Sequence, residues 1–148
     1  MPAKKAQLTE AAASQYQSFI SGIKLVGIAL KSARCDVNHD SYFDALRSEN
    51  AEKSISAGYA LKELGDDFFE SESKLLVEIK NQNGEGVLSV ECVFNSHYHA
   101  IKPNKAFAKR FTESEARLIM WPFFREMVFD LTARMNIPPV TIPLSTER

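Results

Sequence analysis

The clearest hydrophobic pattern in the chain runs from Val87 to Ile101, where apolar and polar residues alternate. On an extended strand, one face would carry Val90, Cys92, Phe94, Tyr98 and Ala100, and the other Glu91, Asn95, His97 and His99. This alternation is typical of an antiparallel sheet with one face on a core and one in solvent. The segment is therefore predicted to be a strand.

Two segments before it are also predicted to form strands. Phe19 to Cys35 is rich in branched apolar residues and contains two glycines, which are poor helix formers. Residues 54–81 are interpreted as a strand pair that breaks near Gly65-Asp66-Asp67, with two helices as the alternative because Leu61 and Leu64 have helical spacing. Asn81–Gly86 is a turn that joins antiparallel strands.

The remaining segments of the N-terminal half are polar. Residues 1–15 are expected to be a flexible segment or a loose helix, ahead of a single domain at 16–144 and a tail at 145–148. Asp36–Lys53 is interpreted as a long connection, and such connections are often functional.

A helix is predicted toward the C-terminus. Thr112 and Glu115 have the spacing of a capping box ahead of an apolar run. Pro122 would cost about 3 kcal/mol inside a helix, so the helix is expected to kink there or a second helix to begin there. Asn136 and the Pro138-Pro139 pair are expected to end it.

This helix is apolar over more than one face. One stripe, of the width that a helix packs on a sheet, contains Met120, Trp121, Phe124, Met127, Val128, Leu131 and Met135. Outside it lie Leu118, Ile119, Phe123 and Phe129. A single sheet covers one face, so the second group favours contact with another subunit; packing under loops of the same chain is the alternative.

Composition adds few constraints. The 148 residues suit one domain, and a net charge of −1 with a pI of about 6.3 gives no basic excess for nucleic acid or an anionic membrane. The longest early apolar run, Leu25–Leu30, is too short for a membrane span or a secretion signal. Cys35 and Cys92 form no CxxC pair, which favours reduced thiols in the cytoplasm, although one disulfide remains possible.

Histidines provide the main candidate for site chemistry. His97 and His99 would point the same way on a strand, and with Glu91, Asn95 or His39 they form a possible metal site or a small-ligand enzyme site. No fourth ligand has characteristic spacing, so two solvated histidines are favoured and no metal, cofactor or catalytic residue is predicted. Cys92 falls on the apolar face, where an inert thiol is expected.

The C-terminal segment carries a resemblance to a known family. Its elements are Met120-Trp121-Pro122-Phe123, then Arg125-Glu126, the helix, and Pro138-Pro139. This arrangement resembles the terminal helix and tail of the SecB export chaperones. Upstream, an Asp-Asp pair, a long strand, a turn and a strand containing Cys and Glu are similar too, so the resemblance covers most of Phe19 to Leu144.

The resemblance implies an α+β fold, in which a long C-terminal helix packs on one face of a four-stranded antiparallel sheet. It also implies a homotetramer, built as a dimer of dimers with helices between two sheets, and a holdase that binds unfolded polypeptide without ATP. The expected oligomer interface is Val90, Cys92, Phe94, Trp121, Phe123, Phe124, Met127 and Phe129. The expected client-binding residues are aromatic, with a place in the core as the alternative: Tyr42, Phe43, Phe68, Phe69 and Tyr98.

Two departures bear on the partner. In the family, acidic residues on the first strand and on the Cys/Glu strand dock the motor SecA; Glu91 matches, but Gly27 and Lys31 stand where acidic residues are expected. The chain also stops at Arg148, without the usual second C-terminal helix and acidic tail. Both departures count against SecA-linked export. Preprotein export, which the resemblance implies, is still the main predicted function. The alternative is a SecB-like chaperone for the antitoxin of a toxin–antitoxin system.

Overall fold

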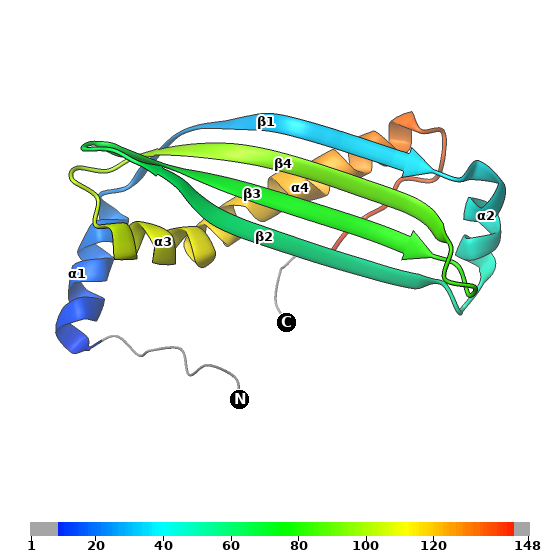
Figure 1. Cartoon of the computed structure of the whole chain (residues 1–148), viewed down its shortest axis with the longest axis horizontal. Helices are drawn as coiled ribbons and strands as arrows, with labels where there is room; N and C mark the ends of the chain where they lie inside the picture. Colours follow the sequence, from blue (N-terminus) through cyan, green and yellow to red (C-terminus); the bar gives the residue numbers. More distant parts are fainter. Residues whose placement is uncertain (1–8, 144–148) are drawn as a thin grey trace.

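Four long strands form one antiparallel sheet in the order β1-β4-β3-β2. The computed structural model describes residues 9–143. The strands are β1 (Lys24–Val37), β2 (Glu52–Leu64), β3 (Phe68–Lys80) and β4 (Gly86–His99). The helices are α1 (Glu10–Ser21), α2 (His39–Arg47), α3 (Lys105–Glu113) and α4 (Glu115–Arg134). Figure 1 shows α4 behind the sheet, with α2 at one end and α1 and α3 at the other. The predicted α+β architecture is confirmed.

Two hairpins and one crossover connect the strands. β2 and β3 join through Gly65-Asp66-Asp67, and β3 and β4 through Asn81–Glu85, as predicted. Gly84 has a φ of +79°, a conformation that residues with a Cβ rarely adopt. The helical alternative for residues 54–81 is wrong. From β1 the chain crosses to the opposite edge of the sheet through α2, so β1 pairs only with β4.

The predicted alternation in β4 is confirmed. Cys92 is fully buried on the inner face that carries the helices, between Ala33 of β1 and Leu75 of β3. Its neighbour Glu91 lies half-exposed on the outer face. Burial raises the pKa of the Cys92 thiol to about 12, and the nearby Glu91 charge adds to the effect, which agrees with an inert thiol.

The predicted helix start is misplaced, and no second helix begins at Pro122. Thr112 caps nothing, because it lies inside α3 and its buried hydroxyl is 2.6 Å from that of Ser71 on β3. Asn104 caps α3 instead, accepting a hydrogen bond from the Phe107 amide. The interruption between the two helices lies at Ser114, and α4 runs through Pro122. The carbonyl that loses its partner there belongs to Leu118, on an exposed turn of the helix.

Two predictions in the N-terminal half also need correction. The strand predicted from Phe19 begins at Lys24, because Thr9 caps a helix that continues through Ser21. The predicted long connection contains α2, capped by the side chain of Asn38, which accepts from the Ser41 amide. Tyr42 and Ala45, three apart, form the buried face of this short helix.

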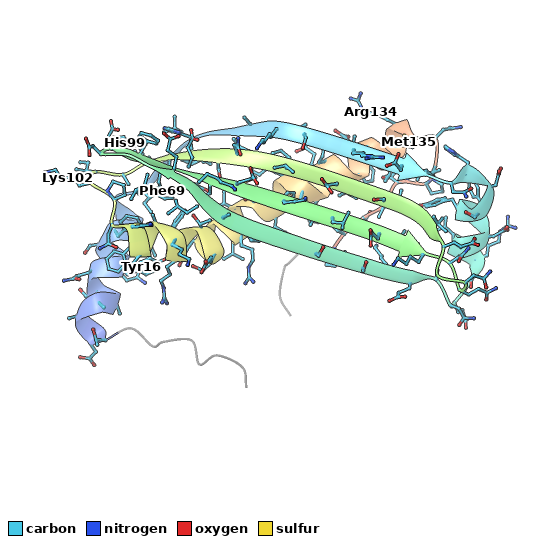
Figure 2. The ribbon with its side chains drawn as sticks, in the orientation of Figure 1. Tyr16, Phe69, His99, Lys102, Arg134 and Met135 are labelled. Carbon is cyan, nitrogen blue, oxygen red and sulfur yellow. The ribbon has the colours of Figure 1, made fainter. Side chains whose placement is uncertain are left out.

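The inner face of the sheet carries two hydrophobic clusters. The larger lies under α4 and α2 and contains, among others, Tyr42, Leu75, Val90, Phe94, Trp121, Phe124, Val140 and Ile142. The smaller lies under α1 and α3 and contains Phe69, Tyr98, Ala100, Ala108, Phe111 and Ala116. Figure 2 shows Tyr16 and Phe69 at the α1/α3 end, and Met135 toward the α2 end.

Candidate functional site

A cavity of about 330 Å³ opens at the α2 end of the molecule. Four parts of the chain surround it: α2, the start of β2 with the loop before it, the end of β3, and the chain that follows α4. Its lining is mainly apolar and comprises Tyr42, Ala45, Leu46, Ser48, Ala51, Lys53, Ile79, Pro138, Pro139, Val140 and Thr141. Leu46 is 51% exposed, and Phe43, from the same helix, is 45% exposed. This end of the molecule therefore presents apolar side chains to solvent around a hollow.

One wall of the cavity is the extended stretch of residues 136–143, named here the C-terminal segment. Asn136 ends the helical region with a φ of +58°, and the chain then turns back along α4 (Figure 1). Ile137, Val140 and Ile142 are buried, whereas Pro138, Pro139 and Thr141 are exposed. The segment thus contributes apolar side chains to the larger core cluster.

Polar side chains of three elements hold the C-terminal segment by its main chain. The Tyr42 hydroxyl of α2 donates to the Pro138 carbonyl at 3.2 Å, and Lys53 Nζ of β2 to the Thr141 carbonyl at 3.3 Å. From α4, Arg125 Nε donates to the Ile142 carbonyl at 3.2 Å and Trp121 Nε1 to the Pro143 carbonyl at 2.7 Å. Thr132 Oγ1 accepts from the Val140 amide at 2.8 Å.

The predicted client-binding residues fall into two groups. Tyr42, Phe69 and Tyr98 are at most 1% exposed and belong to the core, which was the stated alternative. Their burial has a common cause, because each lies on the inner face of its element beneath a neighbouring helix or segment. Phe43 is exposed and Phe68 half-buried, so a client-binding role for these two rings stays a prediction.

The predicted oligomer-interface residues also divide. Within one chain, the buried members pack α4 against the sheet: Val90, Cys92, Phe94, Trp121 and Phe124. Met127 is half-buried. Phe123 and Phe129 remain 39% and 47% exposed on α4, as expected for residues outside the packed stripe. Their contact with another subunit stays a prediction.

Sequence reasoning missed three features of the apolar surface. β1 lies at an edge of the sheet and exposes Leu25, Val26 and Leu30. Leu46 was overlooked because its segment was interpreted as a loop, although its spacing from Phe43 is helical. The burial of the C-terminal segment was not predicted, and its apolar residues were the available signal for it.

Carboxylates and lysines pair on the outer face of the sheet. Glu72 lies 3.0 Å from Lys31 and 3.8 Å from Lys62, and Glu91 lies 3.6 Å from Lys74. The hydrogen bond from Lys31, together with the lysine charges, lowers the pKa of Glu72. Glu91, the predicted translocase-docking residue, is thus partly neutralised by a neighbouring cation.

His97 also lies on this outer face. Its Nδ1 is 3.0 Å from Glu70 Oε1, and its ring stacks on Phe68 with centroids 5.0 Å apart. Within residues 9–143, no group of three or more His, Cys, Asp or Glu side chains has the geometry to hold a metal ion. His39 lies elsewhere, with Nε2 2.7 Å from the carbonyl of Met135. The structure does not bring His39 together with His97.

Comparison with known proteins was informative only at the level of structure. Neither a protein-family model nor a curated protein matches the sequence. A SecB-like chaperone from Mycobacterium tuberculosis, Rv1957, solved in complex with a ChAD peptide from the antitoxin HigA1 (Rv1956), superposes with a TM-score of 0.74. The match covers 90% of this chain and 99% of that one, at 16% sequence identity. The chain has the SecB-like fold.

A second solved structure is a protein of unknown function from Streptococcus agalactiae. It covers 82% of this chain and 97% of its own at 8% identity, and its TM-score of 0.45 is too low to infer a shared fold. Among residues 9–143, no helix is both long and apolar enough to cross a membrane. In this fold, the cavity lies at the α2 end of the sheet, and α1 and α3 cover the opposite end.

Proposed function

We propose that this protein is an ATP-independent holdase that binds non-native polypeptide in the cytoplasm. The observation that carries the proposal is the apolar surface around the α2 cavity, with Phe43 and Leu46 half in solvent, in a chain of SecB-like fold. Burial of apolar surface gives about 25 cal/mol per Å² and requires no particular client sequence. The proposed work is binding rather than catalysis.

Two settings are proposed for the client. Export of preproteins is the setting that the family resemblance implies, and it requires a docking surface for SecA. The alternative is a dedicated antitoxin, and two observations favour it. The M. tuberculosis protein of the same fold was solved with a peptide from an antitoxin. On this chain, lysines pair with Glu72 and Glu91 on the sheet face where acidic residues would dock the motor.

We also propose a homotetramer, a dimer of dimers, as the working assembly. β1 supports this because an edge strand with free backbone groups and exposed Leu25, Val26 and Leu30 is suited to pairing with another chain. On α4, Leu118, Phe123 and Phe129 supply a second uncovered apolar surface. Light scattering coupled to size-exclusion chromatography measures the assembly; a monomer at micromolar concentration would rule out the tetramer.

The test of the holdase function is aggregation of a denatured client diluted into buffer without nucleotide. We expect a stoichiometric amount of the protein to suppress the light scattering of the client. No suppression by folded protein would rule out a general holdase and leave a single dedicated client to be tested. An antitoxin peptide and a preprotein, compared in the same assay, then separate the two settings.

The docking surface has its own test. If lost negative charge prevents docking of SecA, Lys31→Glu should create measurable binding to the motor, and Lys31→Gln should not. Absence of binding by both the native protein and Lys31→Glu would count against the export setting.

A further inference from the structure

The C-terminal segment is bound as a polypeptide ligand would be. Within residues 9–143, residues 137–143 make no main-chain to main-chain hydrogen bond. Instead, side chains donate to four of its carbonyls, from residues 138, 141, 142 and 143. A carbonyl is common to all residues, so contacts of this kind bind a chain without reading its sequence.

The groove that holds the segment is formed by side chains of α2, β2 and α4: Tyr42, Lys53, Trp121, Arg125 and Thr132. Apolar side chains provide the rest of the binding. Ile137, Val140 and Ile142 are 6%, 6% and 1% exposed, and the residues between them face outward. The groove therefore accepts an extended chain with branched apolar residues three and then two positions apart.

The groove continues into open space beside the segment. The cavity of about 330 Å³ is bounded by Pro138–Thr141 on one side and by α2 on the other. Leu46 lines the cavity and is 51% exposed, and Phe43, on the same helix, is 45% exposed. Two of the donors, Tyr42 and Lys53, line this cavity. A client chain that enters there would meet the same donors that hold the segment.

We propose that this groove is the polypeptide-binding site and that residues 136–143 occupy it as an internal competitor for the client. The inference rests on the proposed holdase function and names its site and its ligand: an extended, uncharged segment with apolar residues spaced as Ile137, Val140 and Ile142 are. A client then binds by displacing the chain's own segment. The apparent affinity for the client is the intrinsic affinity multiplied by the fraction of molecules in which the segment is out of the groove.

The single tryptophan of the chain reports on this exchange. The indole N–H of Trp121 donates to the Pro143 carbonyl, and the ring is 6% exposed. Displacement of the segment breaks this bond and changes the surroundings of the ring. The probe is a free peptide with the sequence of residues 136–142, Asn-Ile-Pro-Pro-Val-Thr-Ile, ending in an amide and added to the full-length protein. It keeps the Ile142 carbonyl but lacks that of Pro143, so it cannot restore the bond to Trp121.

Four results are expected. The free peptide shifts the tryptophan emission at saturation, and it competes with a denatured client for the protein. Ile142→Ser, which weakens the internal segment and leaves the groove intact, tightens binding of a fluorescein-labelled copy of the peptide at least tenfold. Combined with Ile142→Ser, which already weakens the internal segment, Arg125→Ala removes a donor from the groove and weakens binding of the labelled peptide relative to Ile142→Ser alone. The control is Ile101→Ser, because Ile101 is 79% exposed outside the groove, and it should leave binding unchanged.

The test separates this inference from the holdase function. Suppressed aggregation together with no competition by the peptide and no emission shift would overturn the internal competitor and leave the holdase function standing. Peptide binding that Ile142→Ser tightens, without any suppression of aggregation, would support the groove and refute the holdase. If Ile142→Ser does not fold, competition by the free peptide against the native protein decides.

Discussion

Both ends of the sheet are covered by aromatic side chains, but only one end is closed. At the α1/α3 end, Phe69, Tyr98 and Phe111 pack mutually, with ring centroids 5.0, 5.1 and 5.7 Å apart, and Phe19 stacks on Phe69. At the α2 end, Tyr42 is buried, but its neighbour Phe43 is 45% exposed.

The cover itself also differs between the ends. Helices cover the α1/α3 end and satisfy their own main chain, whereas an extended segment covers part of the α2 end and depends on side chains for its hydrogen bonds. The side chains that bond the C-terminal segment can bond the carbonyls of another chain instead. The cover at the α2 end can therefore be replaced, whereas the helices at the other end cannot. We therefore expect stability to depend mainly on the closed end and the proposed binding to depend on the open end.

The largest effect on stability is expected at the closed end. Phe69→Ala removes a fully buried ring that contacts three other aromatic rings, and should lower the free energy of unfolding by about 3–5 kcal/mol. Urea denaturation measures the change. Phe43→Ala is the matched control from the open end, and a similar cost for both variants would contradict the comparison.

A smaller cost is expected where the segment meets α4. The Thr132 hydroxyl donates to the Val128 carbonyl at 2.7 Å and accepts from the Val140 amide at 2.8 Å. Thr132→Val keeps the shape but leaves the buried Val140 amide without its acceptor, which should cost about 1–3 kcal/mol. Thr132→Ser keeps the hydroxyl and should lose less. Equal losses for Val and Ser would mean that packing, rather than the hydrogen bond, holds the segment.

Substitutions at the rim of the open end should separate stability from binding. The double variant Phe43→Ser, Leu46→Ser changes two exposed side chains, so its free energy of unfolding should stay within about 0.5 kcal/mol per site of the native value. Its capacity to suppress client aggregation should nevertheless fall. Ile101→Ser, an exposed apolar change elsewhere, is the control; an equal loss of capacity there would argue against a localised site.

The smallest effect is expected on the outer face, which both ends share. Lys31 lowers the pKa of Glu72 below its ordinary value of 4.5, so this pair stabilises the fold fully above that pH. The contribution is lost as the pH falls through the lowered pKa of folded Glu72. Because Lys31 is 57% exposed, solvent screens the pair, and Lys31→Ala should cost less than about 1 kcal/mol at pH 7. Urea titrations of both proteins at pH 7 and pH 3 test this: the difference should be smaller at pH 3 than at pH 7.

The strand pattern was predictable because it depends on local rules. Alternation in β4 and the glycine-containing turn at Asn81–Glu85 are visible in single segments of sequence. The helix boundaries were less predictable because tertiary contacts decide them. Thr112 has the sequence of a cap, but Ser71, 41 residues away, takes its hydroxyl into the core. No window of sequence around Thr112 contains that information.

The candidate site was predictable only in part for the same reason. Phe43 was predicted from its aromatic ring, and it is exposed. Tyr42 belongs to the core because α2 is a helix, which turns adjacent residues to different faces. The groove could not be predicted, since its donors lie on α2, β2 and α4 and meet only in the folded chain.

The strand order has a consequence for how the chain folds. β2–β3 and β3–β4 are hairpins that close over short loops, whereas Lys24 of β1 pairs with His99 of β4, about half the chain length away. Pairs between residues this far apart in the sequence form slowly, because the entropy of closing the long loop is lost before the pairing compensates for it. A three-stranded intermediate would therefore present the open edge of β4 to solvent until β1 arrives. Pulse-labelling hydrogen exchange should show amides in the β3–β4 hairpin protected before those of β1.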